Sequence, residues 1–220
     1  MAGVSFVIEI DRINEVYLMA SRTGDKTERG SIEIPETKIT AYQALYGRRS
    51  VWKLKDTPVP KESLERMFGT TVWAPNHRLT EPWRFFILEK DSSVRKAVAE
   101  LAYEYVLNES QDANRAAPYR GKIMDPPLVV YVYHTPGKDD FESRENYAAT
   151  CMALQNLAIA GFVEGVSVTI ETGKVIRSEK LNETLGAEPD WLMVGMVTIG
   201  YPDEEPESYR TPATQFTVWE

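Results

Sequence analysis

Two adjacent arginines followed by a serine, Arg48, Arg49 and Ser50, form the most chemically suggestive group in this sequence. They follow a run from Thr40 to Tyr46 whose composition predicts a short helix. Two guanidinium forks and a hydroxyl can all donate to one anion, and a phosphate monoester suits that arrangement. Arginines also suit the C-terminal end of a helix, where the dipole and the last carbonyls favour cations. The residues alone leave both interpretations open.

A second polar cluster lies about one helix further along the chain, between Pro75 and Pro82. Proline fixes its own φ and restricts the residue before it, so residues 76–81 are predicted to form a loop or a broken turn. Aromatic and branched residues follow from Pro82 to Leu88, a composition typical of a strand that enters a core. The sequence therefore predicts a polar loop directly before a buried strand.

Taken in order, these motifs resemble the start of the FMN-dependent nitroreductase family. The resemblance covers roughly residues 40–220, and His77 is similar to the short, minimal branch, which has Ala-Pro-Asp-His before its Pro-Trp. The matching segments are Arg48-Arg49-Ser50, the basic Lys53, Pro58-Val59-Pro60, the helix-like run Leu64 to Trp73, Ala74-Pro75, Pro82-Trp83-Arg84-Phe85, Gly200-Tyr201-Pro202, and Arg210-Thr211-Pro212 with the ending Trp219-Glu220.

The resemblance implies an α+β, nitroreductase-like fold with a central mixed or antiparallel β-sheet flanked by helices, in a domain-intertwined homodimer. Residues 39–220 would form the FMN-binding domain. Residues 1–38 would be an N-terminal extension, because the family usually starts just before its double arginine. An arm that packs on a partner subunit and a decoration without a chemical role are both consistent with this extension.

The resemblance also implies a set of cofactor contacts. Arg48, Arg49 and Arg210 would neutralise the FMN phosphate, with a hydroxyl from Ser50, and Arg49 or Lys53 would place positive charge near the pyrimidine edge. The segment matching Glu171, Thr172 and Gly173 passes over the flavin ring in this family.

Three positions near the loop are less simply assigned. His77 would come from the second subunit and lie near the ribityl chain or phosphate. Trp73 stands where the short branch often has a basic side chain that contacts the cofactor, so it either contacts FMN or only packs. Leu79 and Glu81 replace the Asn and Gln of longer family members, and an acidic Glu81 must point away from a phosphate.

The activity implied by the resemblance is that of an FMN-dependent oxidoreductase with ping-pong kinetics. NADH or NADPH would pass a hydride to flavin N5, and an electron-poor acceptor such as a nitroaromatic or a quinone would then take its place. Because a flavin carries its own redox chemistry, no catalytic side chain is expected. Two alternatives remain: a flavin-binding or redox-sensing protein without efficient turnover, and a flavin-free scaffold for protein contacts.

Composition limits the other possibilities. The chain has 220 residues, 43% of them hydrophobic, and a net charge of −8, which argues against nucleic-acid or membrane-surface partners. A single cysteine, Cys151, excludes an intrachain disulfide and suits the cytoplasm, and its apolar surroundings predict a buried structural thiol. No apolar run is long enough to span a membrane, no secretory signal is evident, and no zinc-ligand spacing or Gly-x-Gly-x-x-Gly loop occurs.

Hydrophobic patterns predict the elements that position these residues. The strongest strand is 128–133, which is apolar throughout and therefore central, and Asn146 to Gly161 is a helix apolar nearly all round, as expected for a helix buried in the core or between subunits. Further helices are predicted at 62–72, at 94–108 after a cap at 91–93, and at 178–185. The buried face of the first of these would carry Leu64, Met67, Phe68 and Val72. Strands are predicted at 166–170 and 191–202, and 109–120 is predicted to be a polar connection.

The N-terminal extension has weaker patterns. Residues 4–10 could begin a strand, Ile13, Val16, Leu18 and Met19 could line one side of a short helix, and the polar stretch 21–31 predicts an exposed loop.

Overall fold

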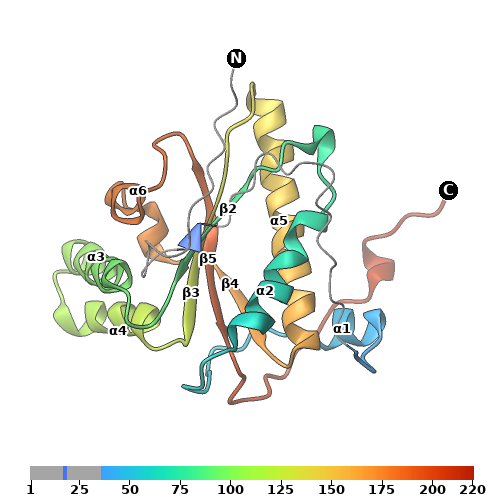
Figure 1. Ribbon diagram of the computed structural model, residues 1–220, viewed down its shortest axis with the longest axis horizontal. Coiled ribbons are helices and arrows are strands. Elements are labelled where there is room, and N and C mark those ends of the chain that lie inside the picture. Colours follow the sequence, from blue (N-terminus) through green and yellow to red (C-terminus); the bar gives the residue numbers. More distant parts are fainter. Residues whose placement is uncertain (1–16, 19–35) are drawn as a thin grey trace.

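A five-stranded antiparallel sheet with helices on both faces forms the centre of the protein (Figure 1). The computed structural model describes residues 17–18 and 36–220. The strand order is β1-β2-β3-β5-β4, and this architecture confirms the predicted α+β class. The strands are β1 (Tyr17–Leu18), β2 (Trp83–Leu88), β3 (Leu128–His134), β4 (Ser167–Glu171) and β5 (Leu192–Gly200).

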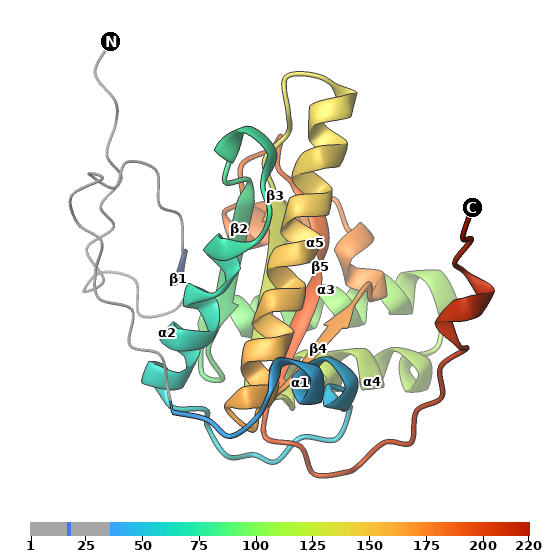
Figure 2. The same cartoon turned by 90° about the vertical axis from the view of Figure 1, so that its right-hand side faces the viewer.

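The helices fall into two layers. Figure 1 shows α3, α4 and α6 on one face of the sheet and α2 and α5 on the other, and Figure 2 shows α1 beside the C-terminal end of α5. No helix in the described part of the chain is long and apolar enough to cross a membrane. The helices are α1 (Ala41–Gly47), α2 (Lys61–Gly69), α3 (Ser93–Ser110), α4 (Ala113–Met124), α5 (Asp140–Val163) and α6 (Lys180–Leu185).

The central strand β3 is buried along its whole length, as its continuous apolar sequence predicts. Alternate side chains of a strand point to opposite faces of the sheet. Val130 and Val132 accordingly join the core beneath α5, whereas Val129, Tyr131 and Tyr133 join the core beneath α3. One strand thus connects two hydrophobic layers.

Helix α5 is longer than predicted because Asp139 caps it: the Asp139 carboxylate accepts from the backbone amide of Glu142 at 2.8 Å. At the other end, a Cβ on Gly161 would lie 2.6 Å from Val168 Cγ2, so only glycine allows β4 to pack this closely. Gly165 has φ of +72°, which lets the chain reverse from α5 into β4. Gly161 and Gly165 therefore allow the chain to turn back after α5 and β4 to pack against that helix.

The prediction of a polar connection at 109–120 is wrong, because most of this stretch belongs to α4. The Asp112 side chain caps the helix by accepting from Asn114 N at 2.8 Å. Ala116 and Ile123 are buried, while Asn114 and Arg115 face solvent. With so few large apolar residues on its inner side, the helix gives only a weak periodic signal.

Smaller predictions also needed correction. Leu18 lies in strand β1, opposite Phe86 of β2, rather than in a helix; the predicted strand at 4–10 and loop at 21–31 lie outside the described residues. Val72 follows the end of α2 in a 3₁₀ turn and is 52% exposed, so it does not extend the buried face of that helix. Cys151 is only partly buried in a single chain.

Candidate functional site

The Arg48–Ser50 segment lies between two anchors. On one side, the backbone amide of Arg48 donates to Ala44 O at 3.0 Å, which closes α1. On the other, the buried hydroxyl of Thr169 on β4 accepts from Val51 N and donates to Val51 O, both at 2.9 Å. Only two residues separate these anchors, so the position of the segment is fixed on both sides.

The chain after Val51 is held by the segment that follows β5. One carboxylate oxygen of Glu204 accepts from the amides of Trp52 and Lys53, both at 3.1 Å. The Lys53 ammonium lies 2.9 Å from Asp203, and this hydrogen bond raises the pKa of Lys53. Ion pairs between exposed side chains are weak, so the pairing does not prevent Lys53 from serving another anion.

Arg49 and Arg48 differ in their surroundings. The Arg49 guanidinium donates to Tyr46 O at 2.6 Å and to Arg48 O at 2.8 Å, and it thereby caps the last turn of α1. Arg48 makes no such contact within the described residues: its Nε is buried and has no hydrogen-bond partner there. The capping interpretation therefore holds for Arg49 and leaves Arg48 available for an anion.

Arg210 lies near Arg48, although 162 residues separate them in sequence. Burial lowers the pKa of Arg48, and repulsion from Arg210 and then Arg49 lowers it further. Arg210 itself is exposed and donates to Tyr209 O at 2.8 Å and to the Ser208 hydroxyl. Three cations close enough to repel one another are stabilised when an anion binds between them.

A cavity of about 350 Å³ adjoins this cluster. Arg48 and Arg49, at the end of α1, line this cavity together with Ser167. The buried Oγ of Ser167 also lacks a partner among the described residues. Glu204 and Glu205 also line the cavity, so it carries both signs of charge. An anion beside Arg48 would satisfy the orphaned Nε, because buried polar groups without partners are costly.

The other predicted cofactor segment lies at the end of β4. Glu171 is the last residue of the strand, and burial raises the pKa of its carboxyl, opposed by nearby Lys122. Thr172 is exposed, and Gly173 begins the 3₁₀ turn Lys174–Arg177. Two residues of strand, about 7 Å, separate Thr169 from Glu171. The structure thus brings the arginine cluster and the 171–173 segment to one region.

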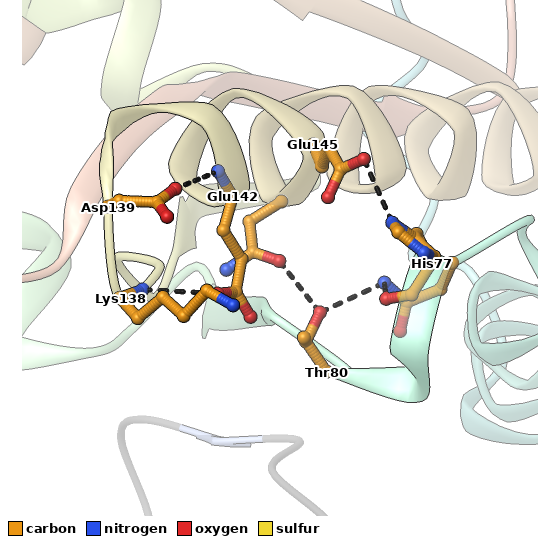
Figure 3. A network of polar contacts seen from close by, with 8 residues as sticks. His77, Thr80, Lys138, Asp139, Glu142 and Glu145 are labelled. Atoms are coloured by element: carbon orange, nitrogen blue, oxygen red, sulfur yellow. Dashed lines mark hydrogen bonds and ion pairs between the residues drawn. The ribbon is translucent and has the colours of Figure 1, made fainter.

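His77 is held at a different place. Its Nδ1 lies 2.9 Å from a carboxylate oxygen of Glu145, near the start of α5 (Figure 3). The predicted loop is fixed by further bonds: Thr80 Oγ1 donates to Asn146 Oδ1 at 2.7 Å, and Asn76 Nδ2 donates to Thr80 Oγ1 at 3.0 Å. The loop therefore has a defined shape that presents His77 at the surface.

Within one chain His77 is far from the arginines. Arg48 and Phe162 line the same cavity at the C-terminal end of α5, whereas Glu145 lies near its start. Seventeen helical residues from 145 to 162 span about 26 Å at 1.5 Å per residue. Figure 1 likewise shows α1 and the loop between α2 and β2 at opposite ends of α5. A single chain does not bring His77 to the predicted cofactor.

Trp73 does not pack into the core of one chain, because its ring is 69% exposed. Glu81 is also exposed, and its backbone has φ of +45°. More apolar residues are exposed on α1 and α5, two helices that lie on the side nearest the viewer in Figure 2. The most exposed on these helices are Tyr42, Leu45, Tyr46, Phe141 and Tyr147.

Sequence reasoning did not find Thr169, Ser167 or Glu204. The two hydroxyls are two residues apart on β4 and therefore lie on one face of the strand, which is a pattern that the sequence shows. Glu204 lies in an acidic loop whose composition gives no indication of its two backbone contacts.

The fold and this site define a class of α+β protein with a basic cluster beside the sheet edge. The sequence profile described as the Nitroreductase family matches residues 45–201. This match covers most of the chain, and the protein therefore belongs to the nitroreductase family, a family of enzymes.

Individual relatives agree with this assignment. The chain is 26% identical to "Putative NAD(P)H nitroreductase YfhC" of Bacillus subtilis (strain 168), over 75% of this chain and 86% of that protein. Among solved structures, the nitroreductase-like family protein from Bacillus cereus gives a TM-score of 0.76 at 26% identity, covering 85% of this chain and 99% of that one. The FMN and NADPH-dependent nitroreductase NfnB from sphigopyxis sp. strain HMH gives a TM-score of 0.70 at 17% identity, covering 82% and 99%, which shows a shared fold.

Proposed function

We propose that this protein is an FMN-dependent oxidoreductase that takes reducing equivalents from NADH or NADPH and delivers them to an electron-poor acceptor, such as a nitroaromatic or a quinone, by a ping-pong mechanism. The observation that carries the proposal is the buried Nε of Arg48, which has no partner in the described part of the chain and lies beside the cations Arg49 and Arg210. A phosphate monoester neutralises such a cluster and accepts several charge-assisted hydrogen bonds.

In this proposal each part of the site has a distinct role. Arg48 and Arg210 bind the phosphate, the Ser50 hydroxyl donates to it, and Arg49 adds charge from its capping position. The Glu171–Gly173 segment lies against the flavin ring, and Lys53 serves its pyrimidine edge after exchanging its exposed contact with Asp203. When bound, FMN supplies the hydride and electron transfer, so the protein binds, orients and shields rather than reacts.

The proposal includes a homodimer that completes each site with residues from two copies. Exposed aromatic residues on α1 and α5 give the protein an apolar face, and large patches of this kind mark interaction sites. His77 lies about 26 Å along α5 from the arginine cluster of its own chain. In an antiparallel pair of copies, it would approach the cluster of the other subunit instead.

The test uses the purified protein and its visible spectrum. We expect a yellow protein that loses its flavin absorbance on anaerobic addition of NADH or NADPH. The absorbance should recover when a nitroaromatic or quinone is added. Parallel lines in initial-rate plots would support ping-pong kinetics. Bound flavin that resists both nicotinamides would instead indicate a binding or sensing role, and a protein that stays colourless after incubation with FMN would refute the proposal.

A further inference from the structure

Thr169 has contacts unlike those of the other buried hydroxyls of the sheet. It is fully buried on β4, and its one hydroxyl both accepts from Val51 N and donates to Val51 O, at 2.9 Å each. This pair of bonds joins positions 118 residues apart. A hydroxyl can serve as donor and acceptor at once, whereas valine, of similar shape, can do neither.

We infer that Thr169 is a positioning residue for cofactor binding, an inference that rests on the proposed function. Its contact with Val51 fixes the backbone one residue after Ser50, and consecutive Cα atoms are about 3.8 Å apart. The other end of the Arg48–Ser50 segment is fixed by the end of α1. Loss of the Thr169 contact would free the side of the segment that bears the Ser50 hydroxyl.

Thr169 also sets the spacing between two parts of the site. The strand that carries it continues through Ile170 to Glu171, where the segment expected against the flavin ring begins. One side chain therefore ties the phosphate-binding segment to the ring-binding segment. A ligand that bears both a phosphate and a ring depends on this spacing, whereas a ligand without a phosphate depends on it less.

Glu204 holds the next part of the same backbone, because its carboxylate accepts from the amides of Trp52 and Lys53. Glu204 does not contact Val51, so the position of Val51 depends on Thr169. The bonds made by Thr169 are therefore the ones nearest to Ser50.

The experiment compares FMN with riboflavin, which has the same ring but no phosphate. Thr169→Val removes both bonds, Thr169→Ser retains the hydroxyl, and Thr150→Val is the matched control. Thr150 is also fully buried, and its hydroxyl donates to Asn146 O at 2.9 Å, within α5 alone. Dissociation constants for both ligands are measured by titration of the full-length apoprotein, alongside thermal unfolding.

We expect Thr169→Val to reduce the preference for FMN over riboflavin by about tenfold, as befits two lost hydrogen bonds. Thr169→Ser should restore most of the preference, and Thr150→Val should leave it at the wild-type value and lower thermal stability less, because it removes one hydrogen bond within α5 rather than two. An unchanged preference in Thr169→Val, or an equal loss in Thr150→Val, would overturn the inference. A wild-type protein that binds neither flavin would refute the proposed function itself.

Discussion

Two partly or fully buried arginines on opposite sides of the sheet are used in different ways. Arg95 on α3 is fully buried and donates to main-chain carbonyls, including Ile123 O at 2.8 Å and Leu88 O at 3.2 Å. Arg48 lies at the end of α1, and its buried Nε has no partner among the described residues. Burial lowers the pKa of both, that of Arg95 to about 10. They share the cost of burial but not the compensating contacts.

The difference separates a structural cation from a ligand-binding one. Arg95 ties α3 to the turn before β3, where the carbonyls of Met124, Pro126 and Pro127 accept from it, and to Leu88 at the end of β2. No anion is needed there, because the carbonyl dipoles satisfy the guanidinium. Arg48 faces two other cations instead, so its desolvation remains uncompensated until an anion binds.

Substitution of Arg95 tests its structural role and should change stability the most. Arg95→Met should lower the free energy of unfolding by about 3 kcal/mol or more, because several buried carbonyls lose their donor at once. Urea denaturation would measure this. The preference of the folded fraction for FMN over riboflavin should stay unchanged, and a stability loss below about 1 kcal/mol would contradict the assigned role.

The next effect concerns the ligand-binding side. Arg48→Ala should weaken FMN binding by about 1–3 kcal/mol, the usual range for a hydrogen bond to a charged group. Riboflavin affinity should change little, and apoprotein stability should be equal to or above wild type because a repulsive cation is removed. Arg115→Ala, at an exposed position on α4, controls for the change in net charge. Unchanged FMN affinity in Arg48→Ala would show that the cluster is assigned to the wrong ligand.

A smaller effect tests whether the arginine cluster is completed by another chain. His77→Ala should weaken FMN binding by about 0.5–1.5 kcal/mol, although within its own chain His77 contacts the other end of α5, about 26 Å of helix away. Titration calorimetry can measure this, and apoprotein stability should hardly change because the contact with Glu145 is exposed. If FMN affinity is unaffected, the site does not include this residue from either copy.

The smallest effect is a pH dependence from Glu171, the half-buried carboxyl at the end of β4. Burial raises its pKa in the folded state, so the folded protein holds this proton more tightly than the unfolded chain. Ionisation of Glu171 therefore lowers the free energy of unfolding as the pH rises from the ordinary pKa of glutamate to the raised one. Below the ordinary pKa it has no effect. Glu171→Gln should raise the Tm at pH 7 and leave it unchanged near pH 4. A lower Tm at pH 7 would contradict the direction of this shift.

The order of the elements was largely predictable from the sequence. The continuous apolar residues predicted strand β3, the capping residues at 91–93 predicted α3, and apolar composition predicted most of α5. Helix α4 was missed because its inner side is mostly small, and β1 was missed because two residues of pairing leave almost no pattern. Local sequence records periodicity and caps, but not a short pairing decided by a neighbouring strand.

The site was predictable in part. The family resemblance marked Arg48, Arg49 and Arg210, which the structure brings near one another. It did not distinguish Arg49, which caps α1, from Arg48, whose Nε has no partner among residues 17–18 and 36–220. The supporting contact from Thr169 was not predicted, since a side-chain bond across 118 residues leaves no trace in spacing. Roles that depend on tertiary contacts require the structure.

The most direct test of the central claim is a crystal structure of the protein soaked with FMN. We expect a phosphate within hydrogen-bonding distance of the Arg48 and Arg210 guanidinium groups and the Ser50 hydroxyl, with the flavin ring against residues 171–173. A phosphate bound elsewhere, with those guanidinium groups directed into solvent, would contradict it.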